Sequence, residues 1–321
     1  MENNIFLAYL IVGKKLFDIT NMFLNSVSPV AIVFLFGYVA GKKKIFLPSD
    51  VIGLFKFIAN ISAPAIMINI LITTDISILD TNLLILYIIS ELLTYLSAFL
   101  ICKFFLKLSF GNALLCGLAA SFGNHVLFVY PIALFAFPSE MITPVKGIII
   151  ADIFIFTFTL VWLDIISKVN LKKIIAVGKQ FQNPIFMGLV LGLLLRFSPF
   201  KNHTAIVHGS EFISYAAAPC GLFASGILLA QTHFLGNIKL AGILTFFKMI
   251  FHPILGFCLI IIIGEYSIHD AQTTLMVTVA PIGIMAVTFA NQYKMNAEAV
   301  AQAVLWSFLL SILWIPILGS L

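Results

Sequence analysis

The sequence predicts an all-α polytopic membrane protein with ten transmembrane helices in two inverted five-helix repeats. Three observations predict it: an apolar composition, ten apolar runs of membrane-spanning length, and matched prolines in the two halves. Of 321 residues, 61% are hydrophobic and 10% are charged, and the mean hydropathy is +1.12. A soluble domain is roughly half apolar and about a quarter charged. This chain therefore has too little polar surface to cover a water-exposed globule, and we expect lipid to be its solvent.

Ten apolar runs between short polar breaks are each long enough, at about 20 residues, to cross some 30 Å of hydrocarbon. The predicted spans are residues 22–41, 50–73, 82–106, 111–137, 143–167, 183–200, 209–231, 240–264, 272–293 and 297–320.

These spans divide the chain into four parts. Residues 21–168 form the first repeat, residues 169–182 a cytoplasmic linker, and residues 183–321 the second repeat. Residues 1–20 carry Lys14 and Lys15 after their apolar stretch, whereas a signal peptide has its positive charge before it. We interpret residues 1–20 as an uncleaved interfacial segment, with a signal peptide as the alternative.

The net charge of +5 matters less than the placement of the lysines, which follow the odd-numbered spans. These residues are Lys42, Lys43, Lys44, Lys103, Lys107, Lys168, Lys172, Lys173, Lys179, Lys239 and Lys294. The other loops are mainly acidic, with Arg196 and Lys201 as exceptions. The positive-inside rule then predicts a cell-membrane protein with both termini outside the cytoplasm. No basic patch interleaved with aromatic residues indicates a nucleic-acid partner.

Prolines recur at matching intervals in the two halves. The three pairs are Pro29 with Pro184, Pro64 with Pro219, and Pro131 with Pro281. The first two pairs are each 155 residues apart, and the third is 150 apart. Because five is an odd number, the second copy enters the membrane from the opposite side. Inverted repeats with interrupted helices in matching positions are typical of secondary transporters and their midplane sites.

Pro131 and Pro281 are predicted to break the fourth and ninth spans, because proline lacks an N–H and clashes with the preceding turn. The freed backbone groups would be costly in lipid unless they are buried in protein or face a polar cavity. Two broken helices that cross at mid-membrane would satisfy this condition. They would also point positive half-helix N-termini at a bound anion.

At these residues the sequence resembles the auxin efflux carrier family, which includes bacterial malonate and malate permeases. The motifs that carry the resemblance are "NHVLFVYP" from Asn124 to Pro131, "PIGIMAVTFANQY" from Pro281, "NP" at Asn183, "GLFASGILLA" and "KMIFHP". The resemblance runs from about residue 26 to residue 320.

The resemblance implies a crossover fold like that of bile-acid symporters and sodium/proton antiporters. It implies a scaffold of helices 1, 2, 6 and 7, a transport domain of the other six, and elevator-type alternating access. The implied substrate is a small organic anion, either a dicarboxylate such as malonate or malate or an auxin-like acid. Scaffold helices in this family often form dimers, so we also expect a homodimer.

Seven residues near the predicted crossing are candidates for substrate binding: Asn124, Pro131, Pro281, Ile282, Gly283, Pro64 and Pro219. An Asn amide can donate and accept hydrogen bonds without the desolvation cost of a charge, so Asn124 suits a carboxylate. Its alternative role is to bond the backbone freed by Pro131. The prolines can equally be ordinary kinks or first-turn residues.

Asp152 and Glu91 are candidates for proton or sodium coupling, because an acid inside a span is functional by default. Asp152 can instead pair with Lys146 or Lys248, and Glu91 can reach the interface. Lys56 and Lys248 are expected to snorkel as anchors. His125, one helical step from Asn124, is expected to face another surface.

We expect no resident cofactor and no metal, since no cysteine or histidine pair has metal-ligand spacing. A sodium/proton antiporter or sodium-coupled symporter shares the predicted architecture, but Asp152 has no acidic neighbour in the sequence. An intramembrane enzyme would need zinc, aspartyl or serine motifs that are missing from the chain. A sensor would need an output domain, and the longest loop is too short for one.

Overall fold

The computed structural model describes residues 13–167, 182–232, 235–293 and 296–321, and within these ranges the protein is helical with no β-strand. The α-helices are α2 (Ser28–Lys42), α3 (Pro48–Phe57), α4 (Ala63–Thr73), α5 (Thr81–Leu100), α6 (Phe110–Ser121), α7 (Tyr130–Ala136), α8 (Ser139–Ser167), α10 (Pro184–Arg196), α11 (Thr204–Ser214), α12 (Ala217–Leu229), α13 (Ile238–Phe246), α14 (His252–Phe257), α15 (Ile268–Thr278), α16 (Met285–Gln292) and α17 (Ala297–Gly319).

Seven continuous helices in the described ranges are long and apolar enough to cross a membrane, so the chain is a multi-pass membrane protein. They are Gly13–Lys42, Ser49–Thr73, Thr81–Phe105, Ser139–Ile166, Thr204–Leu229, Ile238–Ile263 and Ala297–Gly319. The predicted boundaries of these spans are right to within a few residues at most ends. The other three predicted spans contain shorter helices, because two are interrupted and α10 ends at Arg196 after 13 residues.

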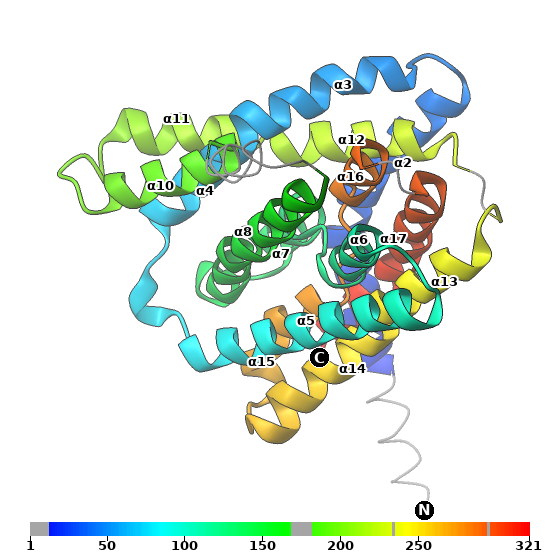
Figure 1. The fold of residues 1–321 in the computed structure, drawn as a ribbon. Coiled ribbons are helices and arrows are strands. Elements are labelled where there is room, and N and C mark those ends of the chain that lie inside the picture. Colours follow the sequence, from blue (N-terminus) through cyan, green and yellow to red (C-terminus); the bar gives the residue numbers. More distant parts are fainter. Residues whose placement is uncertain (1–12, 168–181, 233–234, 294–295) are drawn as a thin grey trace, which may run out of the picture.

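The helices form two flanks with a layer between them (Figure 1). Helices α3, α4, α10, α11 and α12 lie along one side, and α5 and α14 lie along the opposite side. Helices α6, α7, α8, α16 and α17 lie between the flanks. The middle layer contains the first interrupted helix, α6 with α7, and the second half, α16, of the other, whose first half α15 lies beside α14.

Four prolines sit in uninterrupted helical segments because a widened π-helical turn precedes each of them. The π turns are Phe23–Val27, Ile58–Ser62, His125–Val129 and Phe247–Phe251, and they precede Pro29, Pro64, Pro131 and Pro253. In each case the residue before proline donates its N–H to the carbonyl five residues earlier, as Tyr130 does to His125. The wider turn accommodates the ring and the missing donor without ending the helix.

The prediction that Pro131 breaks the fourth span is therefore wrong in position. Pro131 is the second residue of α7, and the interruption lies earlier, at residues 122–124 between α6 and the π turn His125–Val129. Gly123 and Asn124 are poor helix formers and mark the true break. The ninth span is interrupted as predicted, at residues 279–284, around Pro281 and Gly283.

Small residues let two helix pairs approach closely. Helix α2 packs on α12 and α4 packs on α10. A Cβ at Gly37 would overlap the backbone carbonyl of Phe223, and one at Gly188 would lie 2.6 Å from the Cα of Pro64. Such contacts stabilise helix pairs in lipid, where the hydrophobic effect gives no drive for helices to associate.

Arg196, an exception to the predicted charge pattern, has a structural role. Its Nη1 donates hydrogen bonds to the carbonyls of Leu71 and Thr74, the latter at 2.9 Å. These carbonyls belong to the last turn and C-cap of α4, whose C-terminal end attracts a cation. The arginine is thus fixed by its neighbour helix.

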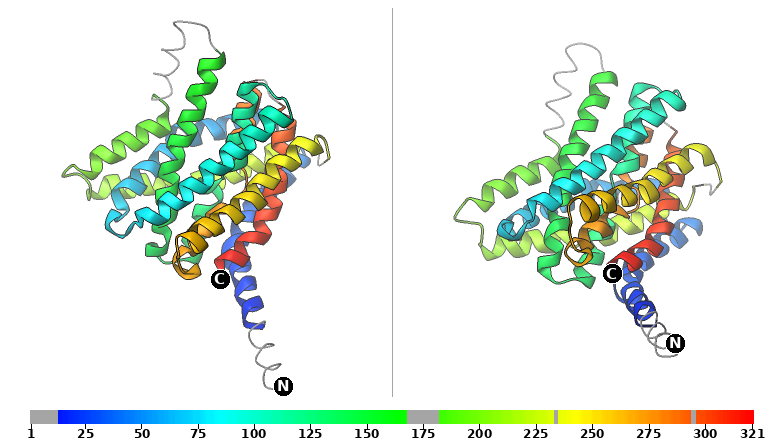
Figure 2. Two further views of the ribbon diagram at one scale, coloured as in Figure 1. Left: turned by 60° about the horizontal axis from the view of Figure 1, so that its bottom comes forward. Right: turned by 90° about the horizontal axis from the view of Figure 1, so that it is seen from below.

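Two predictions lie partly or wholly outside the described residues. Residues 13–20 continue without a break toward α2, and this helix extends beyond the bundle (Figure 2), whereas residues 1–12 are not described. Most of the predicted linker 169–182 is also outside the described residues. The same is true of the lysines at 168, 172, 173, 179 and 294. Membrane orientation therefore stays a prediction.

We expect Gly37→Ala to lower the free energy of unfolding by about 1–3 kcal/mol, because the added methyl meets backbone that cannot move aside. Gly53→Ala in α3 is the matched control, since a Cβ there has nothing within 4 Å. Unfolding in mixed detergent micelles measures both variants. Equal stability of the two would contradict the close-packing interpretation.

Candidate functional site

The two interrupted helices meet and pair through their backbones. Asn124 donates its N–H to the carbonyl of Pro281 at 2.7 Å, and Gly283 donates to the carbonyl of Phe122 at 3.3 Å. Gly123 and Ile282 form an isolated antiparallel bridge. A Cβ at Gly123 would lie 2.8 Å from that of Ala280, so only glycine permits this approach. Each break supplies hydrogen-bond partners for the other.

Two serines on α17 complete the pairing. Ser307 Oγ accepts the N–H of Ile282 at 3.0 Å, and Ser311 Oγ donates to the carbonyl of Val279 at 2.7 Å. Both serines are fully buried. They are four residues apart and so lie on one face of their helix. The second break is held by the first break on one side and by α17 on the other.

The two half-helices that leave the crossing differ at their N-termini. In the second, Ala286 and Val287 donate to the carbonyls of Gly283 and Ile284, so their N–H groups are satisfied locally. In the first, Asn124 has non-helical backbone angles, and the helix begins at His125. The first N–H groups of a helix have no partner within it. The first half-helix therefore offers the more open anion-binding end.

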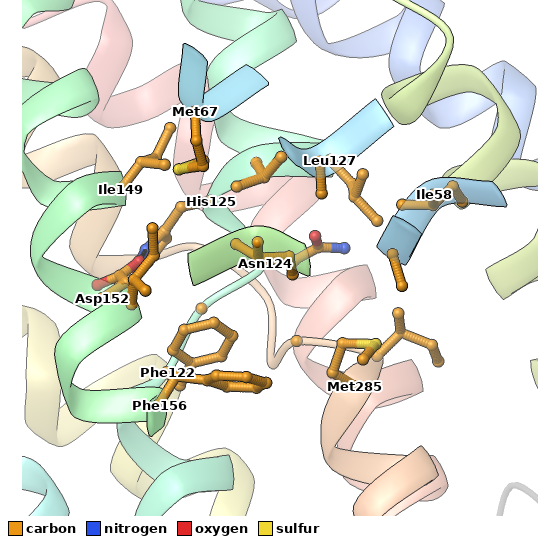
Figure 3. A pocket seen from close by; sticks show the side chains of 18 of the residues that line it. Ile58, Met67, Phe122, Asn124, His125, Leu127, Ile149, Asp152, Phe156 and Met285 are labelled. Carbon is orange, nitrogen blue, oxygen red and sulfur yellow. Dashed lines mark hydrogen bonds and ion pairs between the residues drawn. The ribbon is translucent and has the colours of Figure 1, made fainter. Parts of the chain in front are cut away.

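A pocket of about 120 Å³ lies against the crossing and is lined by 19 residues (Figure 3). One wall comes from α3, α4 and α10, the other from α8 and the two breaks. Its polar side chains are Asn124, His125 and Asp152. In Figure 3 the Asn124 amide points away from His125 and Asp152, which lie together. Within the described chain we find no hydrogen bond from the Asn124 side chain, which leaves it available to a ligand.

The predicted substrate-binding residues lie at four places in the structure. Asn124 and Gly283 line this pocket. Pro281 and Ile282 lie at the crossing and border a small space beside Phe308. Pro64 is not among the lining residues: it packs against Gly188 at the close contact between α4 and α10.

Pro131 and Pro219 line a different, larger pocket of about 620 Å³. It has α2, α11 and α12 on one side and α7 of the middle layer on the other. Val126 borders both pockets. Leu127 lies against Gly221, where a Cβ would be 2.6 Å from Leu127 Cδ1. The contact between Leu127 and Gly221 therefore lies next to Val126, which borders both pockets.

A series of buried polar groups in contact with one another begins at His125 and Asp152 and runs behind the pocket. His125 Nδ1 hydrogen-bonds the Asp152 carboxylate, and its Nε2 lies 3.5 Å from the Tyr87 hydroxyl. The chain continues through Ser90, whose Oγ lies 3.3 Å from His252 Nε2. His252 Nδ1 is 3.1 Å from Lys248 Nζ. The sequence suggested none of these pairings.

Lys248 is not a snorkelling anchor, contrary to our expectation. It is fully buried and donates to the carbonyl of Ser121 at 2.9 Å, at the C-terminal end of α6. An ammonium group at that position complements the negative end of the half-helix. Lys248 lies in the π turn before Pro253, and the interruption of α6 after Ser121 creates the carbonyl that it binds.

Glu91 does not reach the interface, because it is fully buried in α5. It lies within electrostatic range of Asp152, His125 and Lys248. Glu91 and Asp152 are close enough for a hydrogen bond between their carboxyl groups, and apart from each other Glu91 and Asp152 Oδ1 have no hydrogen-bond partner in the described chain. The sequence argument that Asp152 lacks an acidic neighbour is therefore wrong, because α5 brings Glu91 to it. No cluster of three metal-ligating side chains occurs in the described ranges.

Comparisons with known proteins identify the family. The family described as "Membrane transport protein" matches residues 22–318, almost the whole chain, and confirms the resemblance to auxin efflux carriers. A "Putative malonate transporter" of Rhizobium meliloti (strain 1021) is 25% identical over 130 residues. This match covers 40% of the present chain and 41% of that relative, so the chain spans less than half the length of the curated relative it matches.

We expect Ser307→Ala to lower the free energy of unfolding by about 1–3 kcal/mol, because the N–H of Ile282 would lose its buried partner. Ser320→Ala is the control, since Ser320 is partly exposed, bonds only the Ile317 carbonyl of its own helix, and should change stability by less than about 0.5 kcal/mol. Detergent unfolding and amide exchange of residue 282 measure the effect. Unchanged exchange at residue 282 would count against this role of Ser307.

Proposed function

Because this chain belongs to the membrane transport protein family, whose members are transporters, we propose that it is a secondary transporter of a small organic anion. The anion binds in the pocket at the crossing and is carried across by elevator-type alternating access. The relative named for malonate makes a dicarboxylate such as malonate or malate one candidate substrate. An auxin-like acid, implied by the wider family, is the other.

The observation that carries this proposal is the free Asn124 amide beside an open half-helix N-terminus. Both lie at one pocket, between two groups of helices. An amide N–H₂ and first-turn backbone N–H groups are donors that suit a carboxylate. Neither carries a full charge, so the donors themselves add no buried cation that would need a counter-charge. Donors of this kind favour reversible binding of an anion, which a transporter needs.

The position of the pockets supports the elevator mechanism. The pocket with Asn124 and the larger pocket with Pro131 both lie between the same two groups of helices. Small residues of α12, among them Ala217, Gly221 and Ser225, face the π turn that follows Asn124. A smooth surface of this kind would let α7 and its π turn slide as a body, which would open one pocket at the expense of the other.

The packing of the helices supports the inverted-repeat arrangement. The first span packs against the seventh, as α2 on α12, and the sixth packs against the second, as α10 on α4. This exchange is what a two-fold relation between residues 21–168 and 183–321 requires, and the fourth and ninth spans then cross on the axis. Ten spans related in this way would put both termini on one side of the membrane, and we propose that this side is outside the cytoplasm.

We propose that transport is coupled to a proton or a sodium ion through two buried acids. Glu91 and Asp152 form a buried acidic pair with a single buried lysine near it, Lys248. If all three are ionised, the group carries one net negative charge, which one bound cation would neutralise. The His125–Asp152 hydrogen bond connects this group to the pocket.

The same acidic pair favours a second candidate function, a sodium/proton antiporter or sodium-coupled symporter of this fold. In that case the cation is the cargo or co-cargo, and Asn124 only stabilises the crossing. The two candidates differ in whether anion movement depends on Asn124. They also differ in whether sodium moves without an organic anion.

We expect Asn124→Ala to lower uptake of labelled malonate, malate or indole-3-acetate by about tenfold or more in proteoliposomes, because a hydrogen bond to a charged group is lost. Asn60→Ala is the control, since its exposed side chain bonds only the Lys56 carbonyl of its own helix. Imposed pH and sodium gradients show which ion drives uptake. If sodium flux depends on Asp152 without any anion uptake, the antiporter replaces the anion transporter.

We expect Gly221→Leu to slow transport strongly while leaving ligand binding from one side intact, because the new side chain would meet Leu127 and block sliding. Gly53→Leu is the matched control, because a Cβ there meets nothing. Single-turnover uptake and equilibrium binding separate the two steps. Transport at the rate of the control would contradict the elevator mechanism at this contact.

A further inference from the structure

A polar pocket of about 440 Å³ lies at one end of the bundle, where the first span begins and the last span ends. It shares no lining residue with the pocket at the crossing. Gly319 packs on Met22, which brings the end of α17 against the first span, and the end of α7 and the start of α15 complete the walls. Six of the ten lining residues are polar: Asp18, Asn21, Asn25, Ser26, Gln272 and Ser320.

Two of these polar side chains are buried without a partner. Ser26 is 3% exposed and Gln272 is 7% exposed. Neither side chain has a hydrogen-bond partner in the described chain, although both line the pocket. Buried polar groups in proteins are nearly always hydrogen-bonded. The two side chains therefore indicate a polar occupant of the pocket.

The charges around the pocket favour a cationic group. Asp18 lines it and forms no ion pair within the described ranges. Two helices, His125–Ala136 and α17, also end at the pocket, where Ala136 and Gly319 line it. The carbonyl groups at a helix C-terminus carry partial negative charge. Carboxylate, amide and carbonyl oxygens all accept hydrogen bonds from an ammonium group.

The first span also places a positive charge one helical turn from this acid. Lys14, Asp18, Asn21 and Asn25 recur every three or four residues and so share one face of the helix. One turn rises about 5.4 Å, which suits the two-carbon link between the phosphate and the ammonium of a phosphoethanolamine group. Such a group could pair with Lys14 and Asp18 at the same time.

The surroundings favour a lipid over a soluble ligand. Leu16 and Phe17 are 63% and 64% exposed, in the segment where the helix extends beyond the bundle (Figure 2). Exposed apolar side chains grouped in this way are typical of a surface that contacts lipid or a partner. The pocket also lies where the first, fourth, ninth and tenth predicted spans begin or end, which is the depth of the lipid headgroups.

We propose that this pocket binds the headgroup of a phospholipid with a primary ammonium, such as phosphatidylethanolamine. The ammonium donates hydrogen bonds to Asp18 and to the amide oxygen of Gln272, and Lys14 pairs with the phosphate. A choline headgroup has no N–H to donate, and a glycerol headgroup has no positive charge. The site is separate from the crossing, and this proposal does not depend on the substrate of the transporter.

Native mass spectrometry of the full-length protein can compare adducts of phosphatidylethanolamine, phosphatidylcholine and phosphatidylglycerol that have identical acyl chains. We expect phosphatidylethanolamine to bind most tightly. Asp18→Asn should weaken its binding by about tenfold, because a hydrogen bond between charged groups is lost, and Asn21→Asp should strengthen it. Glu140→Gln is the matched control, since Glu140 is an exposed acid that does not line this pocket. None of the three altered side chains is buried, so the variants should fold.

Equal binding of phosphatidylcholine or phosphatidylglycerol would overturn this proposal. So would an Asp18→Asn protein that retains phosphatidylethanolamine as tightly as the unaltered chain does. O-Phosphoethanolamine has the headgroup without acyl chains and should not displace the lipid at equal concentration. If it does, the pocket holds a soluble amine and the lipid assignment is wrong. Because anion uptake is not measured in these experiments, their failure would leave the proposed function standing.

Discussion

The structure depends on one constraint, that peptide groups exposed by broken helices in the middle of a membrane must find partners in the protein. The two breaks meet this constraint mutually, through the bonds from Asn124 to Pro281 and from Gly283 to Phe122. Ser307 and Ser311 satisfy two further groups on the second break, the N–H of Ile282 and the carbonyl of Val279. Because this pairing uses backbone atoms, the Asn124 side chain stays free for the pocket.

The sequence predicted the helices well because the requirement for a span is mainly one of length and apolarity. It placed the second break because Pro281 and Gly283 both disfavour helix in one short stretch. It misplaced the first break because a π turn absorbs Pro131, and a one-residue widening of a helix has no simple composition signal. Gly123 and Asn124 do indicate a break at this position, but Pro131, seven residues after Asn124, is the stronger helix breaker in the sequence and led to the wrong position.

The polar chain behind the pocket was beyond sequence reasoning, because its members come from four separate helical segments. Glu91 and Asp152 were recognised individually as acids inside spans, but their proximity follows from how α5 packs on α8. Lys248 looked like an anchor because it lies near a predicted helix end, yet the carbonyl it binds exists only where α6 stops. Ser307 and Ser311 are four residues apart in an apolar helix, and this spacing indicates a polar contact on one face of α17. The sequence does not indicate which residues that face contacts.

The mutual pairing of the two breaks also constrains how the protein is made. Asn124 leaves the ribosome 157 residues before Pro281, the residue whose carbonyl it needs. At a synthesis rate of about 5–20 residues per second, that delay is roughly 8–30 seconds. During this interval the unpaired peptides of residues 122–124 cannot rest in hydrocarbon without a substitute partner. The insertion machinery, water or a chaperone must therefore shelter the first half until the second arrives.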